Sequence, residues 1–211
     1  YVGEKYGFRV RKVHAKTGIV STLVGNGVAE WGEESLHGSE THCNSVEAGM
    51  WADPDGTVFW GDTSGRLRKY DGKTGVVTTA LGGTTVHDSE PADQAFLRGP
   101  YDVSIAPNGD IYIADSYNQR IRAVDAQTGI IRTAAGNGAR AYGGDGGPAT
   151  GANLGNPGGV SVDSRGRVVI ADTRHGHVRR VDERGIIHNV AGAAFQWDKG
   201  DGGPAINANL V

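Results

Sequence analysis

A unit of about 56 residues repeats along this chain, and this period constrains the fold more than any single residue does. Three segments share one pattern of short apolar runs and charged positions: 58–71, 111–125 and 169–182. The glycines of the turn that follows stand at spacings of 57, 54 and 56 residues, at Gly18, Gly75, Gly129 and Gly185. A period of this length, filled with short strands and tight glycine turns, predicts the blades of a β-propeller.

The composition agrees with many short strands joined by turns, since 35 of the 211 residues are glycine. The net charge of −3 argues against a nucleic-acid-binding surface, which is usually basic. No apolar run approaches the roughly 18 residues that a membrane-spanning helix needs, so we expect no membrane span. The single cysteine, Cys43, excludes an internal disulfide bond and does not identify the compartment.

The third copy of the repeat shows four strands most clearly. We predict strands at 101–106, 110–114, 120–124 and 130–135. The turn after the first strand ends at Gly109, where glycine tolerates a positive φ, and equivalent turns are expected at Gly56 and Gly166. The second strand is apolar at successive positions, which indicates burial on both faces. The third strand alternates charged and apolar residues, which indicates a half-exposed strand nearer the rim.

A second recurring element, Asp-x-x-Pro-Ala-x-x-Ala-x-Leu, connects the blades and begins at Asp88, Asp145 and Asp201. We expect one helical turn after each proline, because proline is pre-organised for the first position of a helix. The aspartate is expected to cap that turn by accepting hydrogen bonds from backbone N–H groups. The alternative is a ring of these carboxylates that holds a ligand or a cation.

These units resemble the NHL-repeat family of β-propellers, in particular its bacterial subtype. The resemblance is carried by the segment 112–115, by the Asn-x-Arg-Ile-Arg pattern at 118–122, and by Gly-Asp-Gly-Gly-Pro-Ala linkers at 144–149 and 200–205. It implies an all-β fold of four-stranded antiparallel blades, usually six in a ring. Propellers of this family serve as interaction platforms, RNA binders and lyase or lactonase scaffolds, so the resemblance leaves the function open. For the compartment, our expectation is an extracytoplasmic or secreted bacterial protein.

The chain is interpreted as one propeller segment, residues 1–211, rather than as a whole ring. We divide it into a partial blade at 1–27, three blades at 28–84, 85–138 and 139–195, and a linker to a next blade at 196–211. A ring of six blades would need about 330 residues at this period. We therefore expect further blades or domains in a longer chain, and a four-bladed ring that lacks one inner strand is the alternative.

The order of the strands predicts which face carries function. Successive antiparallel strands place the interblade linkers and the connections between the second and third strands on one face, called here the linker face. The opposite face carries short, uniform turns, whereas the linker face varies, and variable loops on a repeated scaffold usually carry recognition. The aromatic and ionisable residues expected on the linker face are Trp31, His37, His42, Tyr117, Arg140, Tyr142, His175, His177 and Trp197.

The linker of the second blade departs most from the repeat, because residues 31–44 replace the Pro-Ala turn by aromatic and ionisable side chains. Two neighbouring positions, at 47 and at 101–102, stand where the chain enters the innermost strand of a blade. Aromatic and charged side chains grouped on a rigid scaffold are the usual material of binding sites. We therefore predict a ligand- or partner-binding site at Trp31, His42, Glu47, Tyr101 and Asp102. The alternative is that this linker carries no function.

A divalent cation is one interpretation of the inner acids. In metal-dependent propeller lactonases and lyases, to which the resemblance extends, metal ligands come from comparable inner positions, which here are Glu47 and Asp102. Calcium or zinc would fit such ligands only in part, and polar residues at a solvated channel mouth are the other interpretation. The pair His175 and His177 falls in a surface turn of the repeat, which argues against a role in metal binding.

Two functions therefore remain. The first is a non-catalytic binding or interaction propeller, which presents loops for a protein or small-molecule ligand on its linker face. No catalytic residue is assigned, because repeated scaffold positions account for most charged residues. The alternative is a metal-assisted lyase or hydrolase, similar to a lactonase, at the mouth of the central channel. Glu47 and Asp102 would then hold the ion, and His42 would act as the base.

Overall fold

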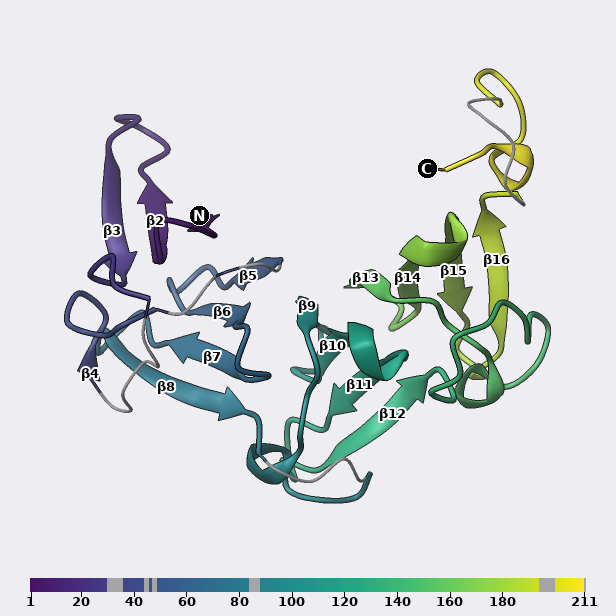
Figure 1. Ribbon diagram of the computed structural model, residues 1–211, viewed down its shortest axis with the longest axis horizontal. Coiled ribbons are helices and arrows are strands. Elements are labelled where there is room, and N and C mark those ends of the chain that lie inside the picture. The colour runs from purple at the N-terminus through teal and green to yellow at the C-terminus, as the bar shows by residue number, and fades with distance from the viewer. Residues whose placement is uncertain (30–35, 44–45, 47–48, 84–87, 194–199, 211) are drawn as a thin grey trace. The chain divides into compact units, whose positions relative to one another are not determined.

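The computed structural model describes residues 1–211 except 30–35, 44–45, 47–48, 84–87, 194–199 and 211. Over these residues the protein is all-β, with antiparallel sheets and single 3-10 turns as its helical structure (Figure 1). No helix in this part of the chain is long and apolar enough to cross a membrane. The chain forms two compact units, residues 1–103 and 104–211, and the boundary falls within strand β9 (Pro100–Ile105).

Each sheet is one blade of the repeat. The first sheet contains β1 (Val2–Glu4), β2 (Arg9–Val13) and β3 (Val20–Val24). The second has the order β4-β8-β7-β6-β5 and contains β4 (Leu36–His37), β5 (Met50–Ala52), β6 (Val58–Gly61), β7 (Leu67–Tyr70) and β8 (Val76–Leu81). The third contains β9, β10 (Ile111–Asp115), β11 (Arg120–Val124) and β12 (Ile131–Ala135). The fourth contains β13 (Pro157–Val162), β14 (Val168–Asp172), β15 (His177–Val181) and β16 (Ile187–Ala191).

The predicted blade topology is confirmed. The four strands of blade three lie within one residue of their predicted bounds, and those of β11 are identical. Gly56, Gly109 and Gly166 occupy equivalent turns with φ values of +91°, +91° and +78°. In each turn the glycine N–H donates to the carbonyl three residues earlier at 2.9 Å. A side chain at these positions would force the backbone into a conformation that glycine alone adopts readily.

The linker turns are also confirmed as single helical turns. They are η1 (Ala92–Gln94), η3 (Ala149–Gly151) and η5 (Ala205–Asn207), each after its proline. In the linker of blade four the alanines bury one face, since Ala149 is 2% and Ala152 is 0% exposed. The Ala149 carbonyl accepts from the N–H of Gly136, and the Ala149 N–H donates to Gly185. This turn therefore joins the end of one blade to a strand turn of the next.

Three features differ from the sequence-based expectations. Strand β4 joins the edge of blade two by pairing with the start of β8, where the linker lacks the Pro-Ala turn and is free to run extended. Two further 3-10 turns, η2 (Ser116–Asn118) and η4 (Thr173–His175), fill the connections between second and third strands. The third strand is not half-exposed: four of the five residues of β11 are buried, because Arg122 turns inward to a buried carboxylate at Asp115.

Each unit has its own apolar core. In residues 1–103 the core contains Val10, Val24, Cys43, Val46, Val58, Trp60 and Val77. In residues 104–211 it contains β10, β11, β13 and β14 side chains together with the linker, among them Tyr112, Ala123, Leu154, Val160 and Ile170. Strand β10 is buried on both faces, since adjacent Ile113 and Ala114 are both 0% exposed, as the unbroken apolar run predicted.

Candidate functional site in the linker regions

The predicted binding site falls only partly within the described residues. Trp31 and Glu47 lie outside them, whereas His42, Tyr101 and Asp102 are half-buried. The N–H of Gly49 donates to the carbonyl of Tyr101 at 2.6 Å. A Cβ placed on Gly49 would lie 2.0 Å from Oδ1 of Asp102, so the carboxylate lies directly over this glycine backbone. The structure thus brings the end of the blade-two linker beside the entrance of β9, and ligand binding there stays a prediction.

The blade-two linker is partly built into the core of its unit. Thr41, Cys43 and Val46 are 1%, 3% and 4% exposed, and the Thr41 hydroxyl donates to the carbonyl of His37 at 3.1 Å. Burial, and secondarily the Asp62 carboxylate, raises the pKa of the Cys43 thiol to about 12. The cysteine is therefore a packing residue, since the thiolate and not the thiol is the nucleophile.

The placement of His37 on the linker face was wrong. The N–H of Gly38 donates to the carbonyl of Gly75 at 2.8 Å, which sets His37 beside a turn that belongs to the opposite face. The cause is strand β4, in which His37 pairs with Val76 at the start of β8. Its Nδ1 lies 3.0 Å from the Ser39 hydroxyl.

Several groups of the blade-four linker accept hydrogen bonds from one buried arginine. The Arg179 side chain is 0% exposed, and its guanidinium donates to Oδ1 of Asp145 through Nη2 at 2.8 Å and Nε at 3.1 Å. It also donates to the carbonyls of Asn153 at 2.9 Å and Gly143 at 3.1 Å. Buried Asp172 lies 3.5 Å from Nη1. An arginine side chain thereby fixes both ends of the linker loop to strand β15.

The role predicted for Asp145 was therefore wrong. The turn that follows, η3, has no side-chain hydrogen bond at its N-terminal cap. The carboxylate instead accepts from the buried guanidinium and, through Oδ2, from the Tyr142 hydroxyl at 2.8 Å. A charged donor 34 residues away competes better for this carboxylate than local N–H groups do, because charge-assisted hydrogen bonds are the stronger ones.

Tyr142 is held rigidly and yet remains accessible. Its ring stacks on His177 with centroids 4.3 Å apart and lies 5.2 Å from the guanidinium carbon of Arg179, while 44% of the residue is exposed. Burial of the phenol, and then its bond to Asp145, raises the pKa of Tyr142 to about 12. Gly144, at φ +92°, lets the loop close against Ala152, where a Cβ would lie 2.7 Å from the Ala152 Cα. The tyrosine is thus a preorganised aromatic surface on the linker face.

The two histidines of blade four serve the scaffold. His175 Nδ1 lies 2.9 Å from Oδ1 of Asp172, and in blade three the Asn118 amide donates to Asp115 at the same distance. His177 is 8% exposed, and its Nδ1 contacts the carbonyl of His175. His177 therefore does not lie in the predicted surface turn, because it begins strand β15 and is buried there. Over the described residues no group of three or more His, Cys, Asp or Glu could hold a metal ion, and Glu47 lies outside that search.

Sequence reasoning missed the arginine–aspartate pair at this site. The signal was present, because an arginine recurs in the third strand of every blade, at Arg11, Arg68, Arg122 and Arg179, and an aspartate recurs in the linkers. Arg68, Arg122 and Arg179 are 3%, 1% and 0% exposed, so these arginines do not occupy the exposed face that was predicted for the third strand.

Two family models match parts of the chain. The teneurin NHL domain matches residues 134–199, and the NHL repeat matches residues 97–123. Protein SUPPRESSOR OF QUENCHING 1, chloroplastic, of Arabidopsis thaliana is 29% identical over 178 residues, which are 78% of this chain and 16% of that protein. A Caenorhabditis elegans protein, probable peptidyl-alpha-hydroxyglycine alpha-amidating lyase pgal-1, is 35% identical over 85 residues, 39% of this chain and 23% of the relative. The chain thus spans less than a quarter of each of these relatives.

Solved structures show the same fold at low sequence identity. A Bacteroides thetaiotaomicron protein of unknown function superposes with a TM-score of 0.64 at 18% identity, over 83% of this chain and 42% of that one. A chain of a nidogen/laminin complex superposes with a TM-score of 0.57 at 17% identity, over 89% of this chain and 59% of that one. The bacterial subtype indicated by the linkers stays a prediction. The repeat period, the four antiparallel blades and the matched models together support a β-propeller chain with NHL repeats at residues 97–123 and 134–199.

Proposed function

We propose that this chain is a non-catalytic interaction module that binds a protein partner through its linker face. The main support is the placement of Tyr142, an exposed aromatic side chain. Its hydroxyl donates to Asp145, and its ring contacts His177 and Arg179. Tyrosine is enriched among the residues that dominate interface energies. A ring that is already immobile loses little conformational entropy on binding, so more of its contact energy remains as affinity.

The predicted site of the first unit belongs to the same proposal. Trp31, His42, Glu47, Tyr101 and Asp102 offer aromatic and charged groups for a partner at the blade-two linker. A nidogen/laminin complex contains a chain of this fold, which supports a protein as the kind of partner. The recurring arginines of the third strands form ion pairs within the scaffold. We therefore expect the residues that recognise a partner to lie at positions that differ between blades.

Site-specific photo-crosslinking tests the proposal. A photoreactive phenylalanine analogue at position 142 should cross-link one defined protein in an extract of the source, and the same analogue at Arg165, exposed on an opposite-face turn, should not. Tyr142→Ala should then weaken binding of that purified partner by about tenfold or more. Equal cross-linking at both positions, or an unchanged dissociation constant, would contradict the assignment of the linker face.

Alanine substitutions test the site of the first unit separately. Glu47→Ala and Asp102→Ala should weaken binding of the same partner. Asp53→Ala and Asp163→Ala, which change opposite-face turns, should leave it intact. If all four variants bind equally well, this site has no part in recognition.

A metal-assisted lyase or hydrolase is the second candidate, favoured by the 35% identity to the C. elegans chain named as an amidating lyase. Glu47 and Asp102 would hold a calcium or zinc ion, and His42 would act as the base. Elemental analysis of the purified protein decides between the two functions. One equivalent of metal that is lost in both Glu47→Gln and Asp102→Asn supports the enzyme, whereas a metal-free protein with an intact partner complex excludes this mechanism.

A further inference from the structure

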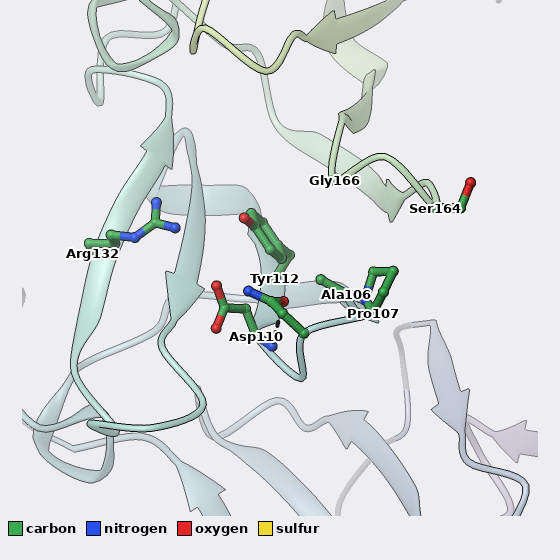
Figure 2. Close-up of a pocket in the computed structure, with 8 residues that line it drawn as sticks. Ala106, Pro107, Asp110, Tyr112, Arg132, Ser164 and Gly166 are labelled. Carbon is green, nitrogen blue, oxygen red and sulfur yellow. Dashed lines mark hydrogen bonds between the residues drawn. The ribbon is translucent and has the colours of Figure 1, made fainter.

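A separate hollow lies within residues 104–211, at the strand turns rather than at the linkers. It has a volume of about 430 Å³ and is bordered by the first turns of blades three and four, at 106–108 and at Ser164 and Gly166 (Figure 2). The side chains of Asp110, Tyr112 and Arg132 complete its lining. Small-molecule sites commonly have volumes of about 300–1,000 Å³, so the hollow is large enough for a small ligand.

The register of blade three places two of the lining side chains in one row. Tyr112 pairs with Ala123 across β10 and β11, and Ala123 pairs with Arg132 across β11 and β12. The three residues therefore form one row on one face of the sheet, and its middle member, Ala123, is 0% exposed and packs in the apolar core. Asp110, in the turn just before β10, lines the same hollow.

The other blades carry a large cation at the middle position. Lys69 stands there in blade two, and Arg180 in blade four. Their row neighbours are Phe59 and Thr78 in blade two, and Val169 and His188 in blade four. Blades two and four therefore lack the combination of a carboxylate, a phenol and a guanidinium that lines the hollow of blade three.

The polar groups of the hollow retain bonding capacity. Oδ1 of Asp110 accepts from the N–H of Ala126 at 3.0 Å, which fixes the carboxylate and leaves Oδ2 for another donor. Within the described part of the chain, no hydrogen bond or ion pair joins Asp110 to Arg132. Figure 2 shows the guanidinium of Arg132 directed toward the hydroxyl end of Tyr112, with the Asp110 carboxylate on the same side. A carboxylate and a guanidinium therefore border one hollow. Backbone hydrogen bonds, and to a smaller extent the charge of Arg132, lower the pKa of Asp125.

We propose that this cavity binds a small zwitterion of the size of a free α-amino acid. Arg132 would pair with the ligand carboxylate, because a guanidinium matches a carboxylate with two parallel hydrogen bonds. Asp110 would accept from the ligand ammonium group. The apolar wall at Ala106 and Pro107 would contact the ligand side chain. This site is independent of the linker face and of any protein partner.

Ligand-observed NMR with the 211-residue chain tests the proposal. Each free α-amino acid is added singly at millimolar concentration, and any that binds is compared with its N-acetylated and C-amidated forms. At least one amino acid should bind saturably, and each blocked form should bind about tenfold more weakly or worse, since each loses one charged contact. Absence of binding across the whole set, or equal binding of the blocked forms, would overturn the proposal.

Three variants locate the binding. Asp110→Asn should weaken it about tenfold, because the ligand ammonium group loses its charged acceptor. Arg132→Gln, at an exposed position, should weaken binding about tenfold. His188→Gln, the matched change in blade four, should leave it unchanged. Binding that is unchanged in both Asp110→Asn and Arg132→Gln would place the amino acid elsewhere, and Tyr142→Ala should not affect it.

Discussion

Replacing Asp145 with alanine should destabilise the second unit, because it removes the linker carboxylate from a buried guanidinium. Two of the bonds from Arg179 end on Asp145 at 2.8 and 3.1 Å, whereas two carbonyls and the carboxylate of Asp172 remain. Breaking a buried ion pair by removal of one partner costs about 3–5 kcal/mol. The side chain of Asp145 is 30% exposed, and Asp172 stays 3.5 Å from the guanidinium, so we expect about 2–3 kcal/mol.

Urea denaturation of the wild type and of two aspartate variants measures this cost. Asp201 occupies the same place in the following linker, is exposed, and makes no hydrogen bond or ion pair within the described residues. If these aspartates acted as local caps, Asp145→Ala and Asp201→Ala would each cost about 0.5–2 kcal/mol. We expect a clear loss for Asp145→Ala and almost none for Asp201→Ala. Equal losses would refute the role of the guanidinium.

A double-mutant cycle isolates the pair itself. Arg179→Met removes the buried cation and leaves Asp172, which is 0% exposed, with the N–H of Gly155 and the imidazole of His175. The double variant with Asp145→Ala should be less destabilised than the sum of the two single variants by about 1–3 kcal/mol. Additive losses would show that Asp145 and Arg179 act independently.

Three further predictions concern single residues. The pKa of Tyr142 lies at about 12, so this phenol should ionise at a higher pH than an ordinary tyrosine in an ultraviolet titration. The contribution of the neutral phenol to stability is complete below pH 10 and is lost as the pH rises from about 10 to about 12. Asp145→Ala should make the phenol ionise at a lower pH. Cys43, with a thiol pKa of about 12, should resist a thiol reagent at mildly alkaline pH in the native protein and react fully after unfolding. Ile113→Ala should cost about 2–5 kcal/mol in urea denaturation, since this side chain is 0% exposed, and a loss below 1 kcal/mol would contradict a close-packed blade centre.

The sequence was informative wherever structure depends on local pattern. The turn at Gly109 and the bounds of β11 follow from residues that are neighbours in the chain, and both were predicted. The partner of Asp145 was not predicted, because Arg179 lies 34 residues away in the sequence. A local helix cap also accounted for the recurrence of this aspartate without any distant partner. The pairing of Leu36–His37 with β8 was missed for a similar reason, since it depends on a free sheet edge rather than on any signal in the two residues.

Comparison of equivalent positions in the blades separates scaffold residues from candidate binding residues. A departure from the repeat pattern does not by itself indicate function. His175 departs from the pattern and carries a reactive side chain, yet it makes the same contact with Asp172 that Asn118 makes with Asp115, so its departure is conservative. Blade three departs from blades two and four at Asp110, Tyr112 and Arg132, and these three polar side chains line one hollow. A search of the sequence for reactive side chains finds His175 but not this hollow, because the hollow depends on the pairing of β10, β11 and β12. In a repeated scaffold, several polar departures that border one hollow are therefore a better indication of a candidate binding site than a single reactive side chain.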